Sequence, residues 1–122
     1  MTRQEVLAYC YINYGIDPDF PFKNDSQTAV LRHPDNKKWF ALLMKLPKKR
    51  LGMDGEEVVD VVNFKVPPEF FGMFGKNEGV YPAYHMNKER WVSVVLSEVP
   101  LEIALLLLEG SYAVTASKAT KR

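Results

Sequence analysis

Cysteine is almost absent from the sequence: Cys10 is the only one in 122 residues. No disulfide can form within the chain, which excludes the small secreted domains that disulfides hold together. A lone cysteine is typical of a reducing compartment, and we therefore expect a cytoplasmic protein. Cys10 falls on the apolar face of a predicted helix, which favours a buried thiol that packs as a small hydrophobe.

Long apolar runs are missing as well. The aliphatic run at residues 103–108 is far shorter than the ~20 residues that a membrane-spanning helix needs. No long apolar run follows residues 1–5, and this does not fit a signal peptide. The sequence therefore predicts no contact with a membrane.

An excess of charge of either sign is also lacking, because 16 basic residues face 15 acidic ones and leave a net charge of +1. This balance argues against a strongly basic nucleic-acid-binding protein, although it allows a local basic patch. Apolar residues make up 47% of the chain, which excludes intrinsic disorder. The length fits one domain, predicted over residues 1–116, with a flexible basic tail at 117–122.

Motifs of metal, cofactor and catalytic sites are not found. His33 and His85 are far apart in the chain, and with a single cysteine they give no metal-ligand spacing. The glycines fit neither a phosphate loop nor a dinucleotide-binding pattern, and there is no nucleophile elbow. The paired acids at Asp17 and Asp19 and at residues 56–57 lie among turn formers, where a solvated surface is the better interpretation. We expect no metal, no cofactor and no enzyme.

What the sequence does contain is a clear alternation of helical and strand patterns. Thr2 and Glu5 have the spacing of a capping box, and Gly15 is placed to end the helix that follows. In a turn at residues 34–36, Pro34 would fix the backbone dihedral of the first turn position, and Asn36 would take the left-handed conformation. Helices are predicted at 2–13, 67–74 and 101–116, the last broken or kinked near residue 110, and strands at 28–33, 38–46, 58–64, 80–85 and 91–96.

The order of these elements, α-β-β-β-α-β-β-α, predicts an α+β fold. Hairpin connections imply a mostly antiparallel five-stranded sheet, and helices that cover one face of it make a two-layer sandwich. In the strand at 38–46, alternation places Phe40, Leu42, Met44 and Leu46 on one face, which we expect to meet the core.

On the other face of that strand, Trp39 and Lys45 would lie together, open to solvent if the helices cover the first face. This would set an aromatic ring among cations. The neighbouring basic residues are Arg32, Lys37, Lys38 and residues 48–50.

One segment resembles a known family. Residues 81–91 read Tyr-Pro-Ala-Tyr-His-Met-Asn-Lys-Glu-Arg-Trp, which is similar to the Tyr-His-Met-Asn-Lys-x-x-Trp segment of MmcQ/YjbR-like proteins. Residues 63–65 (Asn-Phe-Lys) resemble that family's Asn-Leu-Lys motif, and Val99-Pro100 with Ser111-Tyr112 resemble its C-terminal pattern. The resemblance covers nearly the whole chain. At residues 65–68 this chain has Lys-Val-Pro-Pro where the family often has Lys-Cys-Asp-Pro, so any role of that cysteine is absent here.

The resemblance implies a small α+β fold similar to the secretion-chaperone-like and frataxin-like arrangements. It also implies DNA binding, the function with which the family is commonly labelled, and it supplies no catalytic residues. We expect double-stranded DNA as the partner. The chaperone-like fold implies a second hypothesis, a module that docks a partner peptide. A small-ligand site or an enzyme near Tyr84 and His85 is the third. We expect a monomer.

Two segments carry the candidate nucleic-acid contacts. Cations and amides contact phosphates or base edges, and aromatic rings stack on bases. The alternatives are structural: a hairpin turn with flanking aromatics for the second segment, and a solvated loop offset by its own acids for the first. If ~5 phosphates are neutralised, binding weakens with a log–log salt slope near −4 to −5. The candidates are Lys48, Lys49 and Arg50 in the first segment and Tyr84, His85, Asn87, Lys88 and Arg90 in the second.

Overall fold

Helix α1 (Arg3–Tyr14) opens the chain in a computed structural model that describes residues 1–117. The Glu5 backbone N–H donates to the Thr2 hydroxyl at 3.1 Å, and the Thr2 N–H donates to the Glu5 carboxylate at 2.8 Å. Gly15 ends the helix with a left-handed φ of 68°. The face that carries Val6 and Cys10 is buried, which confirms the predicted helix and the buried thiol. Burial raises the pKa of Cys10 to about 12.

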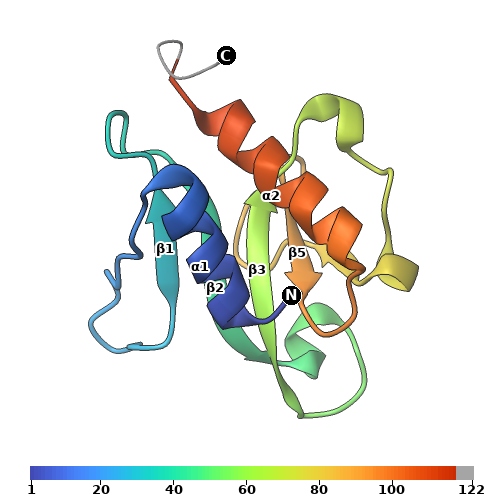
Figure 1. Ribbon diagram of the computed structural model, residues 1–122. Coiled ribbons are helices and arrows are strands. Elements are labelled where there is room, and N and C mark those ends of the chain that lie inside the picture. The colour runs from blue at the N-terminus through green and yellow to red at the C-terminus, as the bar shows by residue number, and fades with distance from the viewer. Residues whose placement is uncertain (118–122) are drawn as a thin grey trace.

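Five strands form a single antiparallel sheet in the order β1-β2-β3-β5-β4 (Figure 1). β3 and β5 are rich in valine, a β-branched residue that packs well on a pleated surface. The predicted α+β class and antiparallel sheet are confirmed. The strands are β1 (Ala29–Arg32), β2 (Trp39–Pro47), β3 (Val58–Lys65), β4 (Val80–Pro82) and β5 (Trp91–Val95).

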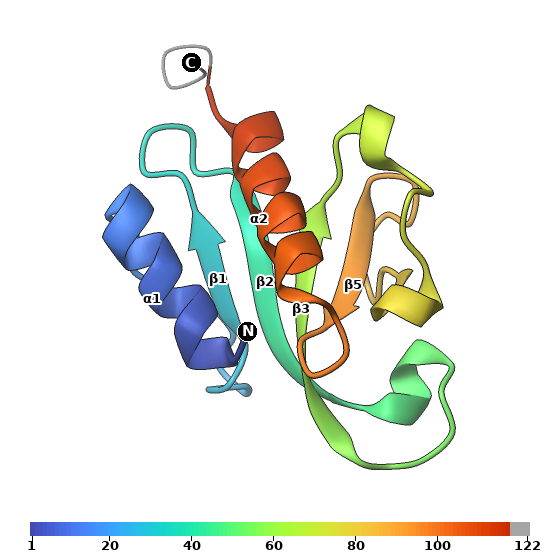
Figure 2. The ribbon, with the colours of Figure 1, turned by 45° about the vertical axis from the view of Figure 1, so that its right-hand side comes forward.

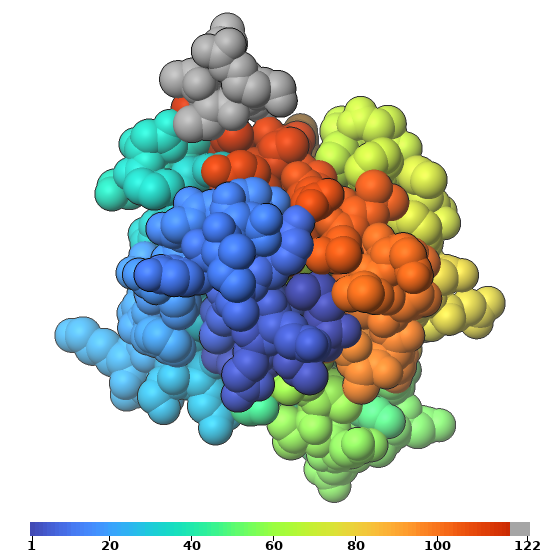
Figure 3. Space-filling view, in the orientation of Figure 1, coloured from blue at the N-terminus to red at the C-terminus, as the bar shows by residue number. Residues whose placement is uncertain are grey.

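Helix α2 (Leu101–Thr115) lies with α1 on one face of the sheet (Figures 1 and 2), and together they cover the middle of the sheet on that side (Figure 3). α2 passes through Gly110 without a break. A Cβ at Gly110 would stand 3.3 Å from both Phe70 and Pro67, so the helix needs a small residue there. The next residue, Ser111, donates to the Phe40 carbonyl at 2.5 Å and accepts from the Lys65 N–H at 2.9 Å, which joins α2 to β2 and β3.

The predicted helix at 67–74 is wrong. Only a short 3-10 turn, η2 (Pro68–Phe70), forms there, and Gly72 then takes a left-handed φ of 85°. A left-handed residue cannot continue a right-handed helix, so the chain turns away after one turn. The rest of the predicted element order is retained.

A one-residue shift in strand pairing overturns the expected faces of β2. Leu31 pairs with Ala41, but Arg32 pairs with Trp39, so Phe40 is an extra residue in β2. Because a bulge interrupts the two-residue alternation, Phe40 packs on the helix side with Ala41, while Trp39 packs on the far face. Trp39 and Lys45 therefore do not share a face, and Lys45 is ion-paired with Asp60 at 2.8 Å.

The sheet face opposite the helices, called here the far face, is covered rather than open. Leu51 and Met53 of one segment and Tyr84 and Met86 of another pack on it, together with Trp39 and Leu46 of β2. The two segments that carry the candidate nucleic-acid contacts thus both lie on the far face. Its buried residues are Val30, Leu42, Met44, Leu51, Val59, Val61, Tyr81 and Val95.

His33 ties the β1–β2 turn to the end of α2. Its Nε2 lies 3.0 Å from the Tyr112 carbonyl and 2.9 Å from the Thr115 hydroxyl. A carbonyl only accepts, so Nε2 carries the proton. In the same turn the left-handed residue is Lys37 (φ 65°), not Asn36 as predicted. The Asn36 side chain instead donates to the Thr115 carbonyl at 2.9 Å and accepts from the Lys38 N–H.

Stability should fall in mild acid because of His33. Burial lowers the pKa of His33 below its ordinary value of 6.5, against smaller opposing effects of the Tyr112 carbonyl and Asp35. The unfolded chain therefore takes up the proton first, so the contribution of His33 is complete above about pH 6.5 and is lost as the pH falls below it. We expect the free energy of unfolding, measured by urea titration, to decrease between about pH 7 and pH 5.

Two histidine variants check this pH dependence. His33→Gln should flatten the decrease, whereas His85→Gln, which changes an exposed histidine, should leave it as in the parent protein. A decrease of equal size in the His33→Gln protein would contradict the assignment.

The residue that follows α2 and its cap is held to the β1–β2 turn. Ser117 donates to the Asp35 carboxylate at 2.6 Å. Residues 118–122 of the predicted tail lie outside the described residues.

No helix in the described part of the chain is both long and apolar enough to cross a membrane. Within residues 1–117, no group of three or more metal-binding side chains gathers in one place.

Candidate functional site

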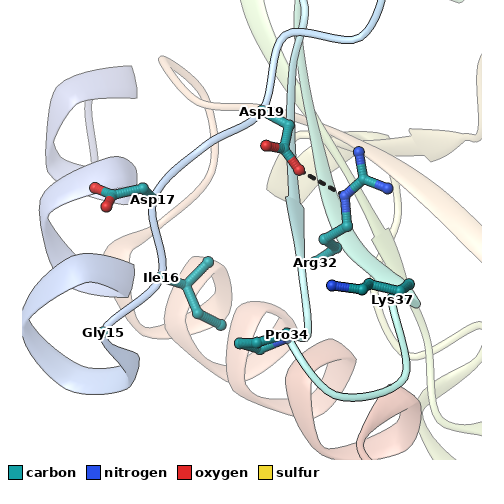
Figure 4. Close-up of a pocket in the computed structure, with 7 residues that line it drawn as sticks. All are labelled: Gly15, Ile16, Asp17, Asp19, Arg32, Pro34 and Lys37. Atoms are coloured by element: carbon teal, nitrogen blue, oxygen red, sulfur yellow. Dashed lines mark hydrogen bonds and ion pairs between the residues drawn. The ribbon is translucent and has the colours of Figure 1, made fainter.

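A pocket of about 330 Å³ lies between the end of α1 and the β1–β2 turn (Figure 4). Asp17 and Asp19 both line it, but their carboxylates point in different directions. Asp19 is ion-paired with Arg32 at 2.6 Å. Lys37 is the other cation of the wall, so two acids and two bases balance each other there. This arrangement offers neither a carboxylate pair for acid–base catalysis nor a net charge for an ion.

The basic run at residues 48–50 is divided by its ion pairs. It forms a 3-10 turn, η1 (Lys48–Leu51), whose last residue, Leu51, is buried on the far face. The Lys48 ammonium lies 3.0 Å from Glu57, and the Lys49 ammonium lies 2.8 Å from Glu56. The predicted neutralisation by nearby acids is therefore real for two of the three cations.

Arg50, the third cation of the run, reaches the other candidate segment. Its Nη1 donates to the Tyr84 hydroxyl at 2.8 Å. Arg50 and Tyr84, which lie far apart in the sequence, thus meet on the far face of the sheet. The sequence alone left open whether the two basic segments would meet. No carboxylate within residues 1–117 forms an ion pair with Arg50.

A buried polar network fixes the backbone of Tyr84. Asn63 of β3 and Ser93 of β5 are paired across the sheet and both are 0% exposed. The Asn63 side-chain amide donates through Nδ2 to the Tyr84 carbonyl at 3.0 Å, and its Oδ1 accepts from the Ser93 hydroxyl at 2.5 Å. The Tyr84 N–H donates to the Ser93 hydroxyl at 2.9 Å. Since every group in this network is hydrogen-bonded, Tyr84 is held in one place. This gives the asparagine of residues 63–65 a structural role.

Three cations surround a small cavity beside Tyr84, which we call the cation pocket. Arg50, Lys76 and Lys88 line it, and its volume is about 180 Å³. Lys76 begins a short 3-10 turn, η3 (Lys76–Glu78), which lies beside η1 in Figures 1 and 2. All three cations are exposed, and in the described part of the chain none of them takes part in an ion pair.

The remaining candidates lie outside the cation pocket. His85 is exposed, has a left-handed φ of 59°, and places its ring centroid 4.0 Å from that of Tyr84. The Asn87 side chain accepts from the Glu89 N–H at 2.8 Å, and the Asn87 carbonyl accepts from the Arg90 and Trp91 N–H groups. Asn87 therefore shapes the turn before β5. The Arg90 side chain is exposed beside this turn.

A second cavity, the aromatic pocket, adjoins the cation pocket. It has a volume of about 220 Å³ and shares Lys76, Pro82 and Lys88 with its neighbour. Sequence reasoning missed both Lys76 and this pocket, because no motif or spacing links residues 71–76 to residues 88–92. Its ring-bearing wall consists of Phe71, Phe74, Tyr81 and Trp91.

Comparisons with known proteins match the chain over most of its length. The family model YjbR matches residues 13–114. The uncharacterised protein YyaQ of Bacillus subtilis is 37% identical over 94% of this chain and 98% of its own length. These matches cover the two pockets and the network beneath Tyr84.

Solved structures agree with the fold described above. A crystal structure of a Pseudomonas syringae protein is 42% identical, with a TM-score of 0.89 over 95% of this chain and all of its own. A crystal structure of a Deinococcus radiodurans protein with a DUF419 domain is 26% identical, with a TM-score of 0.71 over 99% of this chain and 83% of that one. The names of these relatives state no activity, so the function has to be argued from the site.

Proposed function

This chain belongs to the YjbR family, and we propose that it binds double-stranded DNA weakly, through phosphate contacts in the cation pocket. The observation that carries the proposal is the meeting of Arg50, Lys76 and Lys88 around one cavity without an acidic partner. Like charges that gather without a counter-ion repel each other, and a bound phosphate relieves this repulsion.

The chemistry of the three cations suits a phosphate group. The planar guanidinium of Arg50 can donate two parallel hydrogen bonds to a phosphate, while Lys76 and Lys88 act as mobile point charges. The Tyr84 hydroxyl holds Arg50 in place from one side. No base-reading element lies in this pocket, so the contacts would position DNA without reading its sequence.

The salt dependence of binding follows from the number of free cations. Lys48 and Lys49 are already paired, so the three cations of the pocket should neutralise about three phosphates, the bound one and its neighbours along the strand, with a log–log slope near −2.7. We expect the affinity for a labelled duplex, measured by fluorescence anisotropy, to fall about 40-fold between about 50 and 200 mM salt. No binding at low salt, or binding that ignores salt, would overturn the proposal.

Two lysine variants separate the cation pocket from the rest of the basic surface. Lys88→Gln removes a cation of the pocket and should reduce the salt slope by about 1. Lys49→Gln makes the same chemical change at a lysine already paired with Glu56 and should alter the slope less. Equal losses in the two variants would mean that DNA binding is spread over the whole basic surface.

A protein partner is the second candidate function. Phe71 and Met73 are 44% and 57% exposed beside the pockets, an apolar surface that a peptide could cover. Capture of a partner protein from a cell extract would favour this function over DNA binding if the capture survives nuclease treatment and is lost in a Met73→Glu variant.

The buried, unpaired Cys10 supports the further proposal that the protein acts in the cytoplasm.

A further inference from the structure

The aromatic and cation pockets form one continuous surface with two chemistries. They share Lys76, Pro82 and Lys88, so a ligand that fills both needs an anionic part and a flat apolar part close together. The walls of the aromatic pocket come from the loop before η3 and from β4 and β5. The chain brings these segments together at the β4 edge of the sheet.

The rings of the aromatic pocket are available to a ligand. Phe71 is 44% exposed, and Trp91 at the start of β5 is partly exposed. In the part of the chain that the structure describes, neither of these rings nor that of Phe74 packs against another aromatic ring. Tyr81 differs from them, since it is buried and its hydroxyl donates to Glu98 at 2.8 Å.

We propose that the two pockets together bind an unpaired nucleotide of single-stranded DNA, with its phosphate among Arg50, Lys76 and Lys88 and its base against Phe71 and Trp91. A nucleotide joins a flat base to a phosphate through a single sugar, which fits two cavities that share a wall. This inference rests on the proposed function, since the same cations hold the phosphate.

Strand separation decides which nucleic acid can use both pockets. In a duplex the faces of the bases are stacked on their neighbours, so a protein reaches the phosphates and the base edges but not the base faces. In a single strand each base can also stack on an aromatic side chain, which adds affinity with little sequence preference. The protein should therefore bind single strands more tightly than duplexes at the same salt concentration.

An anisotropy titration tests the preference directly. A labelled oligo-deoxythymidine and a labelled hairpin duplex of equal length are titrated at one low salt concentration with the parent protein, Phe71→Ala and Phe20→Ala. Phe20 is a 54% exposed phenylalanine that lines neither pocket, so its variant is the matched control. We expect the parent and Phe20→Ala proteins to bind the single strand about tenfold more tightly than the duplex.

The Phe71→Ala protein should lose this advantage and keep its duplex affinity. Equal affinity of the parent protein for the two DNA forms, or an advantage that survives in Phe71→Ala, would overturn the inference and leave the proposed function intact. Failure of the parent protein to bind either DNA at low salt would overturn both.

Tryptophan fluorescence, compared at saturating concentrations of each DNA, gives a second measurement that does not depend on affinity. The chain has two tryptophans, so Trp39→Phe leaves Trp91 as the only indole. A base stacked on Trp91 should quench its emission when the single strand is added, and the duplex should leave it nearly unchanged. Quenching of the same size by both forms of DNA would contradict a base in the aromatic pocket.

Discussion

Replacing Gly79 by alanine is expected to lower the free energy of unfolding by about 3 kcal/mol, from left-handed strain and crowding together. Gly79 has a φ of +77°, which is costly for a residue with a side chain. A Cβ there would also stand 2.9 Å from the Cβ of Glu98 and 2.9 Å from the Val99 nitrogen. The backbone cannot easily move aside, because it is hydrogen-bonded on both sides of Gly79. The Gly79 carbonyl accepts from the Val95 N–H at 2.9 Å, and the Gly79 N–H donates to the Lys76 carbonyl.

Gly52→Ala isolates the part of this loss that comes from backbone strain. Gly52 has a similar φ of +81°, but a Cβ there would meet no heavy atom within 4 Å. We expect this variant to lose only about 1 kcal/mol. Urea titration of both variants measures the difference, which reports the contact with residues 98–99. Equal losses would show that the segment around Gly79 yields to the added methyl group.

Local signals in the sequence were sufficient for much of the fold. The capping box at Thr2 and the left-handed glycine at Gly15 lie within a few residues of the helix ends that they set, and both are confirmed. The predictions that were wrong depend on long-range strand pairing or on the conformation of a single glycine. The bulge at Phe40 depends on the pairing of β1 with β2, and the short helix expected at 67–74 gives way to the left-handed turn at Gly72.

The candidate site was predictable only in part, for the same reason. Arg50, Tyr84 and Lys88 could be named from a basic run and a family-like segment, and the structure brings them to one cavity. Their meeting could not be foreseen, because β2, β3 and β5 must first pair to bring residue 50 beside residue 84. Lys76 gave no signal at all, since a single lysine after a glycine is common in surface turns.

Asn63→Leu is expected to cost about 3 kcal/mol of folding free energy, although leucine has the same number of side-chain heavy atoms as asparagine and the same branching at Cγ. The change leaves the Tyr84 carbonyl and the Ser93 hydroxyl without the partners that Asn63 provides. Each buried polar group that loses its partner costs about 1 to 3 kcal/mol. Ser93→Ala, measured alone and together with Asn63→Leu by urea titration, should give a double variant that loses less than the sum of the single losses. Strictly additive losses would contradict a shared network.

The same substitution should weaken DNA binding from a position that no ligand touches. Asn63 holds the backbone of Tyr84, and the Tyr84 hydroxyl accepts the hydrogen bond that positions Arg50. If this chain of contacts sets the cation pocket, Asn63→Leu should reduce duplex affinity several-fold under conditions where the protein stays folded. Tyr84→Phe removes only the hydroxyl and should reproduce the loss of affinity with little loss of stability. A folded Asn63→Leu protein with the parent's affinity would show that Arg50 finds phosphate without the network, and the pocket would then depend on charge alone.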